Sequence, residues 1–269
     1  MLKREPFQIE VFTIIMLVGF QRIAGTTIIA EDGPVGEIED LFFHLETWSV
    51  QYVVVNTGSW LSSRKVLLRP NLLSQPDWEQ QQVSISLTRQ QVRKSPGVET
   101  QPPASRQMEH QTAERYKVPF YWGPAGSALA GGGPSGFPLE ARLPLEDRQP
   151  SDAASESENV LRSAHEMKNY TLEATDGTIG HLEDWIVDTQ AWVIRYGVVD
   201  TKNWLPARKV LVHAPWIKST SWSEATATVN LLREEVKGAP RFEPDAPIDR
   251  DYEERLFGYY GRESYWVYV

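Results

Sequence analysis

The chain of 269 residues contains no cysteine, which excludes disulfide bonds, thiolate metal ligands and a cysteine nucleophile. Basic residues are also scarce, since 27 Lys and Arg stand against 36 Asp and Glu, for a formal net charge of -9. This balance opposes non-specific attraction to nucleic acid or to an anionic membrane. A hydrophobic fraction of 41% and a mean hydropathy of -0.40 are typical of a soluble globular protein, for which we expect a cytoplasmic location.

Long apolar runs are lacking as well. Residues 11–20 form an apolar run of about ten residues, roughly half of what a helix needs to cross a bilayer. Lys3 and Arg4 precede the run, as in a signal peptide, but residues 21–25 form a poor cleavage site. Three interpretations stay open: Met16 is the true start and residues 1–15 are an upstream extension, the run opens the first domain, or it is a targeting or membrane-associating segment.

What the chain does contain is one stretch that occurs twice. Residues 48–67 (WSVQYVVVNTGSWLSSRKVL) align without a gap with residues 192–211 (WVIRYGVVDTKNWLPARKVL), which begin 144 positions later. The repeat indicates two copies of one module, here called copy one and copy two, each long enough for its own core. The predicted divisions are an N-terminal extension (1–20), copy one (21–122), a flexible Gly- and Ser-rich linker (123–159) and copy two (160–269).

Short β-branched and alternating runs predict an all-β module. Both copies place Asp-Gly between two such runs, which is a hairpin signal, and a further Gly that indicates a bulge or a close backbone approach. Residues 83–87 alternate between apolar and polar and predict another strand, followed by a short helical turn at 88–94. The fold class is therefore mainly β, with two small, strongly bent barrels in tandem. The shared turn residues are Asp32, Gly33 and Gly36 in copy one and Asp176, Gly177 and Gly180 in copy two.

Each copy ends in an aromatic tail. Tyr252, Leu256 and Tyr259 have helical spacing behind an acidic first turn, which predicts a short amphipathic helix over residues 248–260. Copy one keeps several of the aromatic positions at the same shift, so each copy is predicted to end in a short C-terminal helix. The tail residues that suit self-association or partner binding are Tyr116 and Trp122 in copy one and Tyr260 and Trp266 in copy two.

The carboxylate pair Glu39-Asp40, repeated as Glu183-Asp184, is the best candidate for acid–base chemistry, because paired carboxylates can act as proton donor and acceptor. Adjacent residues of a strand point to opposite faces, however, so we do not expect the two to share one pocket. The favoured interpretation is structural: one carboxylate pairs with Arg64-Lys65, or with the counterpart of that pair in copy two, and the other is solvated.

The histidines do not indicate a catalytic or metal site that belongs to the module, because none of the five recurs in the other copy. The sequence shows no His or carboxylate cluster at metal-ligand spacing, and Gly131-Gly132-Gly133 is followed by proline instead of opening a phosphate-binding helix. We therefore expect no metal, no cofactor and no catalytic residue, and the protein is not predicted to be an enzyme.

Trp60 and Trp204 are each followed four residues later by an arginine, Arg64 or Arg208, which could form a basic-aromatic surface for RNA. The favoured interpretation is that each Trp packs over the end of its barrel, while the arginine stem lies on the ring and its head meets Glu39-Asp40 or the counterpart pair. Trp and Arg are also enriched at protein-binding hot spots, so these four residues are candidate anchors for a protein partner.

Taken together, the Asp-Gly-x-x-Gly turn, the Glu-Asp pair, the Trp…Tyr-x-Val-Val-x-Thr strand and the Trp-Leu and Arg-Lys-Val-Leu motifs resemble the PRC-barrel domain. That domain forms the cytoplasmic part of the photosynthetic reaction-centre H subunit and the C-terminal half of the ribosome maturation factor RimM. The Tyr-Trp tails most resemble bacterial proteins built of two such domains. The resemblance implies a non-enzymatic, protein-binding role and carries over no catalytic residue.

The predicted function is therefore protein–protein interaction, as an assembly or regulatory module. Its partners are unknown proteins, and the two copies are expected to pack together or to form a homo-oligomer. One alternative is a ribosome- or RNA-associated maturation-type factor, which the acidic balance disfavours. Another is a membrane-associated accessory protein of a photosynthetic or electron-transfer complex.

Overall fold

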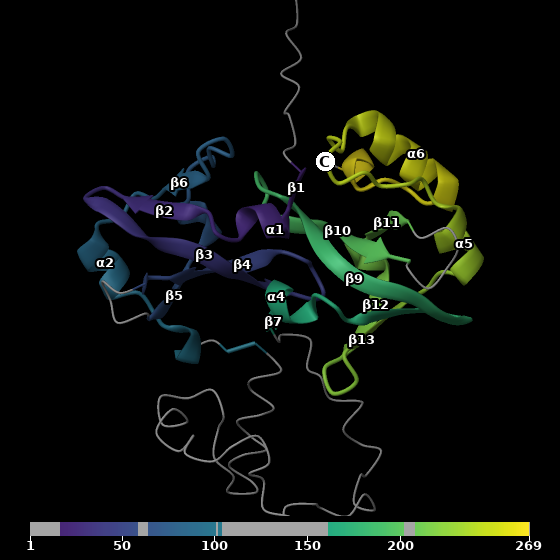
Figure 1. Ribbon diagram of the computed structural model, residues 1–269, viewed down its shortest axis with the longest axis horizontal. Coiled ribbons are helices and arrows are strands. Elements are labelled where there is room, and N and C mark those ends of the chain that lie inside the picture. The colour runs from purple at the N-terminus through teal and green to yellow at the C-terminus, as the bar shows by residue number, and fades with distance from the viewer. Residues whose placement is uncertain (1–16, 59–63, 101, 104–160, 202–207, 269) are drawn as a thin grey trace, which may run out of the picture.

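The computed structural model describes residues 17–58, 64–100, 102–103, 161–201 and 208–268 (Figure 1). Residues 1–16, with the possible start at Met16, and the predicted linker lie outside the described residues.

Copy one contains β1 (Leu17–Gly19), α1 (Phe20–Ile23), β2 (Thr27–Ala30), β3 (Gly33–His44), β4 (Val50–Asn56), β5 (Lys65–Leu68), η2 (Pro70–Leu72), β6 (Gln82–Ser84), α2 (Arg89–Arg93) and η3 (Val98–Thr100). Copy two contains β7 (Leu161–Ser163), α4 (Ala164–Met167), β8 (Thr171–Ala174), β9 (Gly177–Asp188), β10 (Val193–Asp200), β11 (Lys209–His213), η8 (Ala214–Trp216), β12 (Ile217–Ser221), β13 (Thr226–Val229), α5 (Arg233–Gly238), α6 (Arg250–Tyr260) and η9 (Tyr265–Tyr268).

Two mixed sheets form the body, and both follow the same plan. The first has the strand order β5-β4-β3-β2-β6 and the second the order β11-β10-β9-β8-β13-β12. In each sheet one parallel pair, β2 with β6 or β8 with β13, joins strands that are otherwise antiparallel. The mainly β prediction is confirmed. Among the described residues, however, the first and last strands of each order do not pair, so the sheets are open and not closed barrels.

The strand predicted over residues 83–87 is shorter than its alternation suggests. It is β6, which spans Gln82–Ser84, and Ile85 forms only an isolated bridge with Leu73. The predicted helical turn follows as α2, and Thr88 begins it with a capping box.

Two glycines allow the long central strands to pass close to the ends of their neighbours. A Cβ atom on Gly36 would collide with the carbonyl oxygen of Asn56, and one on Gly180 would collide with the carbonyl oxygen of Asp200. Both positions lie beside a register shift between the central strand and the strand before it. A side chain is therefore sterically excluded at the same point of each copy.

The aspartate of each Asp-Gly turn holds the short helix that follows the sheet. Asp32 accepts a hydrogen bond from the backbone N–H of Arg89, the first residue of α2, at 2.7 Å. Asp176 accepts one from the backbone N–H of Arg233, the first residue of α5, at 2.8 Å. These N–H groups have no acceptor within their own helices, so the turn supplies one.

The two copies exchange their first strands. β1 pairs antiparallel with β9 of copy two and places Leu17 opposite Asp188. β7 pairs antiparallel with β3 of copy one and places Leu161 opposite His44. Leu161 lies 144 positions after Leu17, and His44 lies 144 positions before Asp188. Each copy therefore pairs its first strand with the same position of the other copy, and the exchange is reciprocal. In Figure 1 the two halves of the molecule meet at these strands.

A second reciprocal contact joins the hairpin loops of the two sheets. The backbone N–H of Val50 donates to the carbonyl oxygen of Trp192 at 2.8 Å, and that of Ile194 donates to the carbonyl oxygen of Trp48 at 2.9 Å. Trp48 and Trp192 both have positive φ angles, 57° and 51°, which are unusual for bulky side chains. Such backbone conformations persist where surrounding contacts hold them, and here the contacts come from the other copy.

One hydrophobic core contains buried side chains from both copies. At their junction the fully buried ring of Trp48 stacks on Phe43, with centroids 5.3 Å apart, and lies 5.6 Å from Trp185 of copy two. The indole Nε1 of Trp185 donates to the carbonyl oxygen of Ala164 at 3.1 Å. This aromatic cluster links the two sheets through their interior.

The tail helix predicted over residues 248–260 is α6, which begins two residues later than expected. Asp249 caps it by accepting a hydrogen bond from the backbone N–H of Tyr252 at 2.8 Å, and Gly261, with a φ of 60°, ends it. Among the described residues, no helix is both long and apolar enough to cross a membrane.

We expect Trp48→Ala to lower the free energy of unfolding by about 3–5 kcal/mol, because it removes a fully buried ring from the junction of the copies. Trp192→Ala is the control and should cost less, since Trp192 is also buried, at 8% exposed, and has the same positive φ and loop contact, but has no such ring stack in the described part of the chain. Urea denaturation followed by circular dichroism measures both variants. Equal losses would contradict a central role for the aromatic cluster.

Candidate functional site

A β-bulge changes the direction of the repeated Glu-Asp pair. The pairing of β9 with β10 shifts register between Leu182 and Asp184, so Glu183 is an extra residue, and β3 shifts in the same way between Ile38 and Asp40. A bulge breaks the alternation of side chains along a strand. The expectation that the two carboxylates would not share a pocket is therefore wrong for copy two, where Glu183 and Asp184 line the same cavity.

The aspartate of each pair caps a helix that follows the exchanged strand. Asp184 accepts a hydrogen bond from the backbone N–H of Gln21 in α1 at 3.1 Å, and Asp40 accepts one from that of His165 in α4 at 2.9 Å. Asp40 also accepts the hydroxyl of Ser163 at 2.5 Å. The prediction of a solvated carboxylate is wrong here, because the exchange brings helix N–H groups of the other copy to this position.

Burial raises the pKa of both aspartates. Removal from water raises the pKa of Asp40 from 3.8 to about 6, and it does the same for Asp184. The hydrogen bonds described above act in the opposite direction, because they stabilise the ionised carboxylate. Both carboxyl groups therefore titrate well above the range of an exposed aspartate.

The glutamate of each pair binds the lysine of the neighbouring strand. Lys65 Nζ lies 2.5 Å from Glu39 Oε1, and Lys209 Nζ lies 2.7 Å from Glu183 Oε1. All four side chains are about one-third exposed, so solvent screens these pairs and their contribution to stability is small. Their role is to fix the direction of the carboxylates.

The candidate anchors Arg64 and Arg208 hold the segments that follow each sheet. Arg64 Nη1 donates to the carbonyl oxygen of Arg93 at 3.0 Å, and Arg208 Nη2 donates to the carbonyl oxygen of Ala239. Neither guanidinium meets the Glu-Asp pair as the sequence suggests, because the adjacent lysine occupies that position. Four other candidate anchors lie outside the described residues: Trp60, Trp204, Tyr116 and Trp122.

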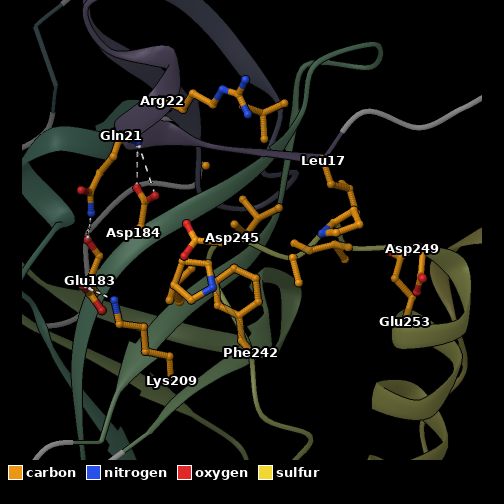
Figure 2. A pocket seen from close by; sticks show the side chains of 18 of the residues that line it. Leu17, Gln21, Arg22, Glu183, Asp184, Lys209, Phe242, Asp245, Asp249 and Glu253 are labelled. Carbon is orange, nitrogen blue, oxygen red and sulfur yellow. Dashed lines mark hydrogen bonds and ion pairs between the residues drawn. The ribbon is translucent and has the colours of Figure 1, made fainter. Parts of the chain in front are cut away.

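A cavity of about 900 Å³ lies between the exchanged strand and copy two (Figure 2). Its walls come from β1 and α1 on one side, from β9, β10 and β11 on another, and from the segment between α5 and α6. The central strands supply apolar surface through Ile186 and Val198, and the segment supplies Phe242. Figure 2 shows Glu183, Asp184 and Lys209 at one end and, at the other, Glu253 of α6 with its capping residue Asp249.

Several lining residues were not singled out by the sequence patterns. Trp78, Phe242 and Asp245 all line the cavity, but Trp78 lies in a turn and the other two lie in an irregular segment. The recurrence of Trp78 as Trp222 is a signal that could have drawn attention to the turn.

A buried glutamate attaches α6 to the second sheet. Glu253 is only 2% exposed and accepts hydrogen bonds from the hydroxyls of Tyr196 at 2.6 Å and Tyr265 at 2.8 Å. Its second oxygen lies 3.3 Å from Arg250 Nη1. Desolvation, together with the negative charge of Glu253, raises the pKa of both tyrosines, so they remain protonated donors at neutral pH.

The tail candidates Tyr260 and Trp266 belong to the aromatic layer around this glutamate. The ring of Tyr260 meets that of Trp216 edge-on, 4.7 Å between centroids, and the guanidinium of Arg250 lies 4.0 Å from the ring centroid of Trp266. His213 is buried in the same layer, and desolvation lowers its pKa to about 4, so it is neutral at pH 7. These aromatic side chains hold the tail on the sheet.

In the described ranges no group of three or more His, Asp or Glu side chains is arranged to hold a metal ion. Comparison of the chain with protein-family models finds no match. A search of curated proteins finds no match either. What the site can do is therefore inferred from its own geometry, which combines an apolar cavity with carboxylates fixed at both ends.

We expect Asp40 and Asp184 to lower the stability of the fold as the pH rises from about 4 to about 6.5. Over this interval the folded protein still binds protons that the unfolded chain, with carboxyl pKa values near 3.8, has already released. Each group contributes at most about 3 kcal/mol to the change. Urea denaturation at several pH values should show that the free energy of unfolding declines less with rising pH in the double variant D40N/D184N than in the wild type. Parallel plots of this free energy against pH for the two proteins would contradict the raised pKa values of Asp40 and Asp184.

Glu253→Gln should lower the free energy of unfolding by about 2–3 kcal/mol, because the buried hydroxyl of Tyr196 and the half-buried hydroxyl of Tyr265 lose a charged acceptor. Glu254→Gln is the control, since Glu254 is exposed on the same helix, and its effect should stay within about 0.5 kcal/mol. Thermal and urea unfolding measure both variants. A loss no larger for Glu253→Gln than for Glu254→Gln would show that the buried glutamate does not anchor α6.

Proposed function

We propose that the chain is a non-enzymatic protein-interaction module of the tandem PRC-barrel type, which acts in the cytoplasm as an assembly or regulatory scaffold. The repeated turn, Glu-Asp pair and Arg-Lys-Val-Leu motifs support the family assignment. Two bulged mixed sheets with the same strand plan support a strongly bent, barrel-like module in each copy.

The observation that carries this proposal is the composite cavity. Its volume of about 900 Å³ falls in the range of sites that enclose a ligand, and its walls combine apolar surface with polar and charged side chains. Copy one supplies β1, α1 and Trp78 to the lining, and copy two supplies the rest. A partner that fits the cavity therefore recognises the two copies only in their assembled arrangement.

The polar groups of the cavity favour binding over proton transfer. Glu183 is held by Lys209, Asp184 caps α1, and Glu253 is shared between two tyrosines and Arg250. Fixed side chains of this kind orient a ligand, because their directions are set before it arrives.

The two alternative functions gain less support from the described residues. The RNA-associated alternative relies on Arg64 and Arg208, whose guanidinium groups donate to backbone carbonyls of their own copies. The membrane-associated alternative relies on residues 11–20. The last four of these form β1 and the start of α1, where Val18 and Phe20 are buried in the core. The buried position of residues 17–20 favours the interpretation that the apolar run opens the first domain.

Blocking the cavity should abolish partner binding. Ala246 is exposed and lines the cavity, so Ala246→Trp places a bulky ring at the cavity without disturbing the core. Immobilised full-length protein should retain a defined set of proteins from an extract of its native cells. The variant should retain them about tenfold less, as expected for loss of a central contact.

Ser223→Trp is the matched control, because Ser223 is exposed and does not line the cavity. It should retain the same proteins as the wild type. Unchanged capture by Ala246→Trp would contradict the cavity as the binding site.

A further inference from the structure

We propose, building on the interaction role proposed above, that the cavity binds a basic side chain carried on an apolar peptide segment of the partner. The partner chemistry follows from three features of the cavity lining: an excess of carboxylates, a buried indole donor without an acceptor among the described residues, and adjacent apolar walls.

Negative charge is available at the end of the cavity that β9 forms. Glu183 binds Lys209 through Oε1, whereas its Oε2 is buried without a hydrogen-bond partner among the described residues. Asp184 accepts hydrogen bonds from backbone N–H groups, and Asp245 forms no ion pair in the described part of the chain. A guanidinium or ammonium group would find charged acceptors here, and such hydrogen bonds are stronger than neutral ones.

The cations at this end are already engaged. Lys209 is bound to Glu183, and Arg22 Nη2 donates to the carbonyl oxygen of Trp78 at 3.3 Å. The three carboxylates of Glu183, Asp184 and Asp245 outnumber these two cations in this part of the lining. The excess charge is therefore negative, and the formal net charge of -9 also attracts a basic partner.

The buried donor belongs to Trp78. This side chain is 8% exposed and lines the cavity, and its Nε1 has no acceptor among the described residues. An unpaired buried donor destabilises a structure, and the carbonyl oxygen of a bound peptide would satisfy it once the indole turns its buried Nε1 toward the cavity. Leu17, Val198 and Phe242 offer apolar surface for the neighbouring side chains of the same peptide. This set of groups suits a peptide better than a bare organic cation, which has no carbonyl oxygen to offer.

Copy one provides a matched control for the key carboxylate. Glu39 holds Lys65 as Glu183 holds Lys209, and Glu39 does not line the cavity. Glu39 also accepts a hydrogen bond from Asn56 Nδ2 at 3.1 Å, so a purely structural effect of removing the charge should be at least as large for Glu39→Gln as for Glu183→Gln. An effect on a ligand in the cavity should appear only for Glu183→Gln.

The test uses the full chain and an acetylated, amidated pentapeptide of sequence Ala-Leu-Arg-Leu-Ala, with citrulline in place of arginine as the neutral comparison. Isothermal titration calorimetry should show that the arginine peptide binds at least about tenfold more tightly than the citrulline peptide. Glu183→Gln and Asp245→Asn should each remove most of this preference, and Glu39→Gln should leave it unchanged. The indole N–H resonance of Trp78, assigned through Trp78→Phe, should shift on binding, and the pKa of Asp184 should fall because a cation has arrived.

Equal binding of the two peptides, or equal losses for Glu39→Gln and Glu183→Gln, would overturn this proposal. Absence of binding would overturn it as well. If any of these results occurred while Ala246→Trp still prevented capture from the extract, the interaction role would stand and only the basic-peptide chemistry would fail. If Ala246→Trp had no effect on capture, the cavity itself would be excluded as the partner site.

Discussion

Each central strand of this protein obtains part of its backbone hydrogen bonding from the other copy. β1 and β7 contain three residues each and pair with β9 and β3 of the opposite sheets. Backbone groups buried at a sheet edge must find partners, and here the partners are exchanged reciprocally. The helix N-termini are paired in the same way, since backbone N–H groups of α1 and α4 donate to Asp184 and Asp40 of the other copy. The positive φ angles of Trp48 and Trp192 lie at a second contact between the copies, where the two hairpin loops exchange backbone hydrogen bonds.

The exchange also explains the chemistry of the junction. Bringing helix ends of the other copy over the bulged strands removes Asp40 and Asp184 from water, and this desolvation raises their pKa values to about 6. The same bulge directs Glu183 and Asp184 to one cavity, where β1 forms a wall. Fixed carboxylates in a largely apolar cavity are typical of a site that orients a ligand. Assembly of the two copies and formation of the site are thus one event.

Much of the sheet plan could be predicted from the sequence, because its signals are local. Alternating strands, the Asp-Gly turns and the amphipathic pattern behind α6 each act within about ten residues. The exchange could not be predicted in this way, since β1 pairs with residues about 170 positions away and its apolar run is equally compatible with other structures. The direction of Glu183 and Asp184 was missed because a two-residue motif does not reveal a bulge. Trp78 and Asp245 were missed because only the tertiary fold brings their irregular segments to the cavity.

The central claim is that the two copies form one body through reciprocal strand exchange, and cleavage of the chain between them tests it most directly. A protease site placed between residues 123 and 159 would separate β1–η3 from β7–η9 without altering either set of strands. After complete cleavage, gel filtration at low micromolar concentration should show both fragments in a single peak at the position of the uncut protein. Two separate peaks, each with the circular dichroism of a folded β-sheet, would contradict the claim.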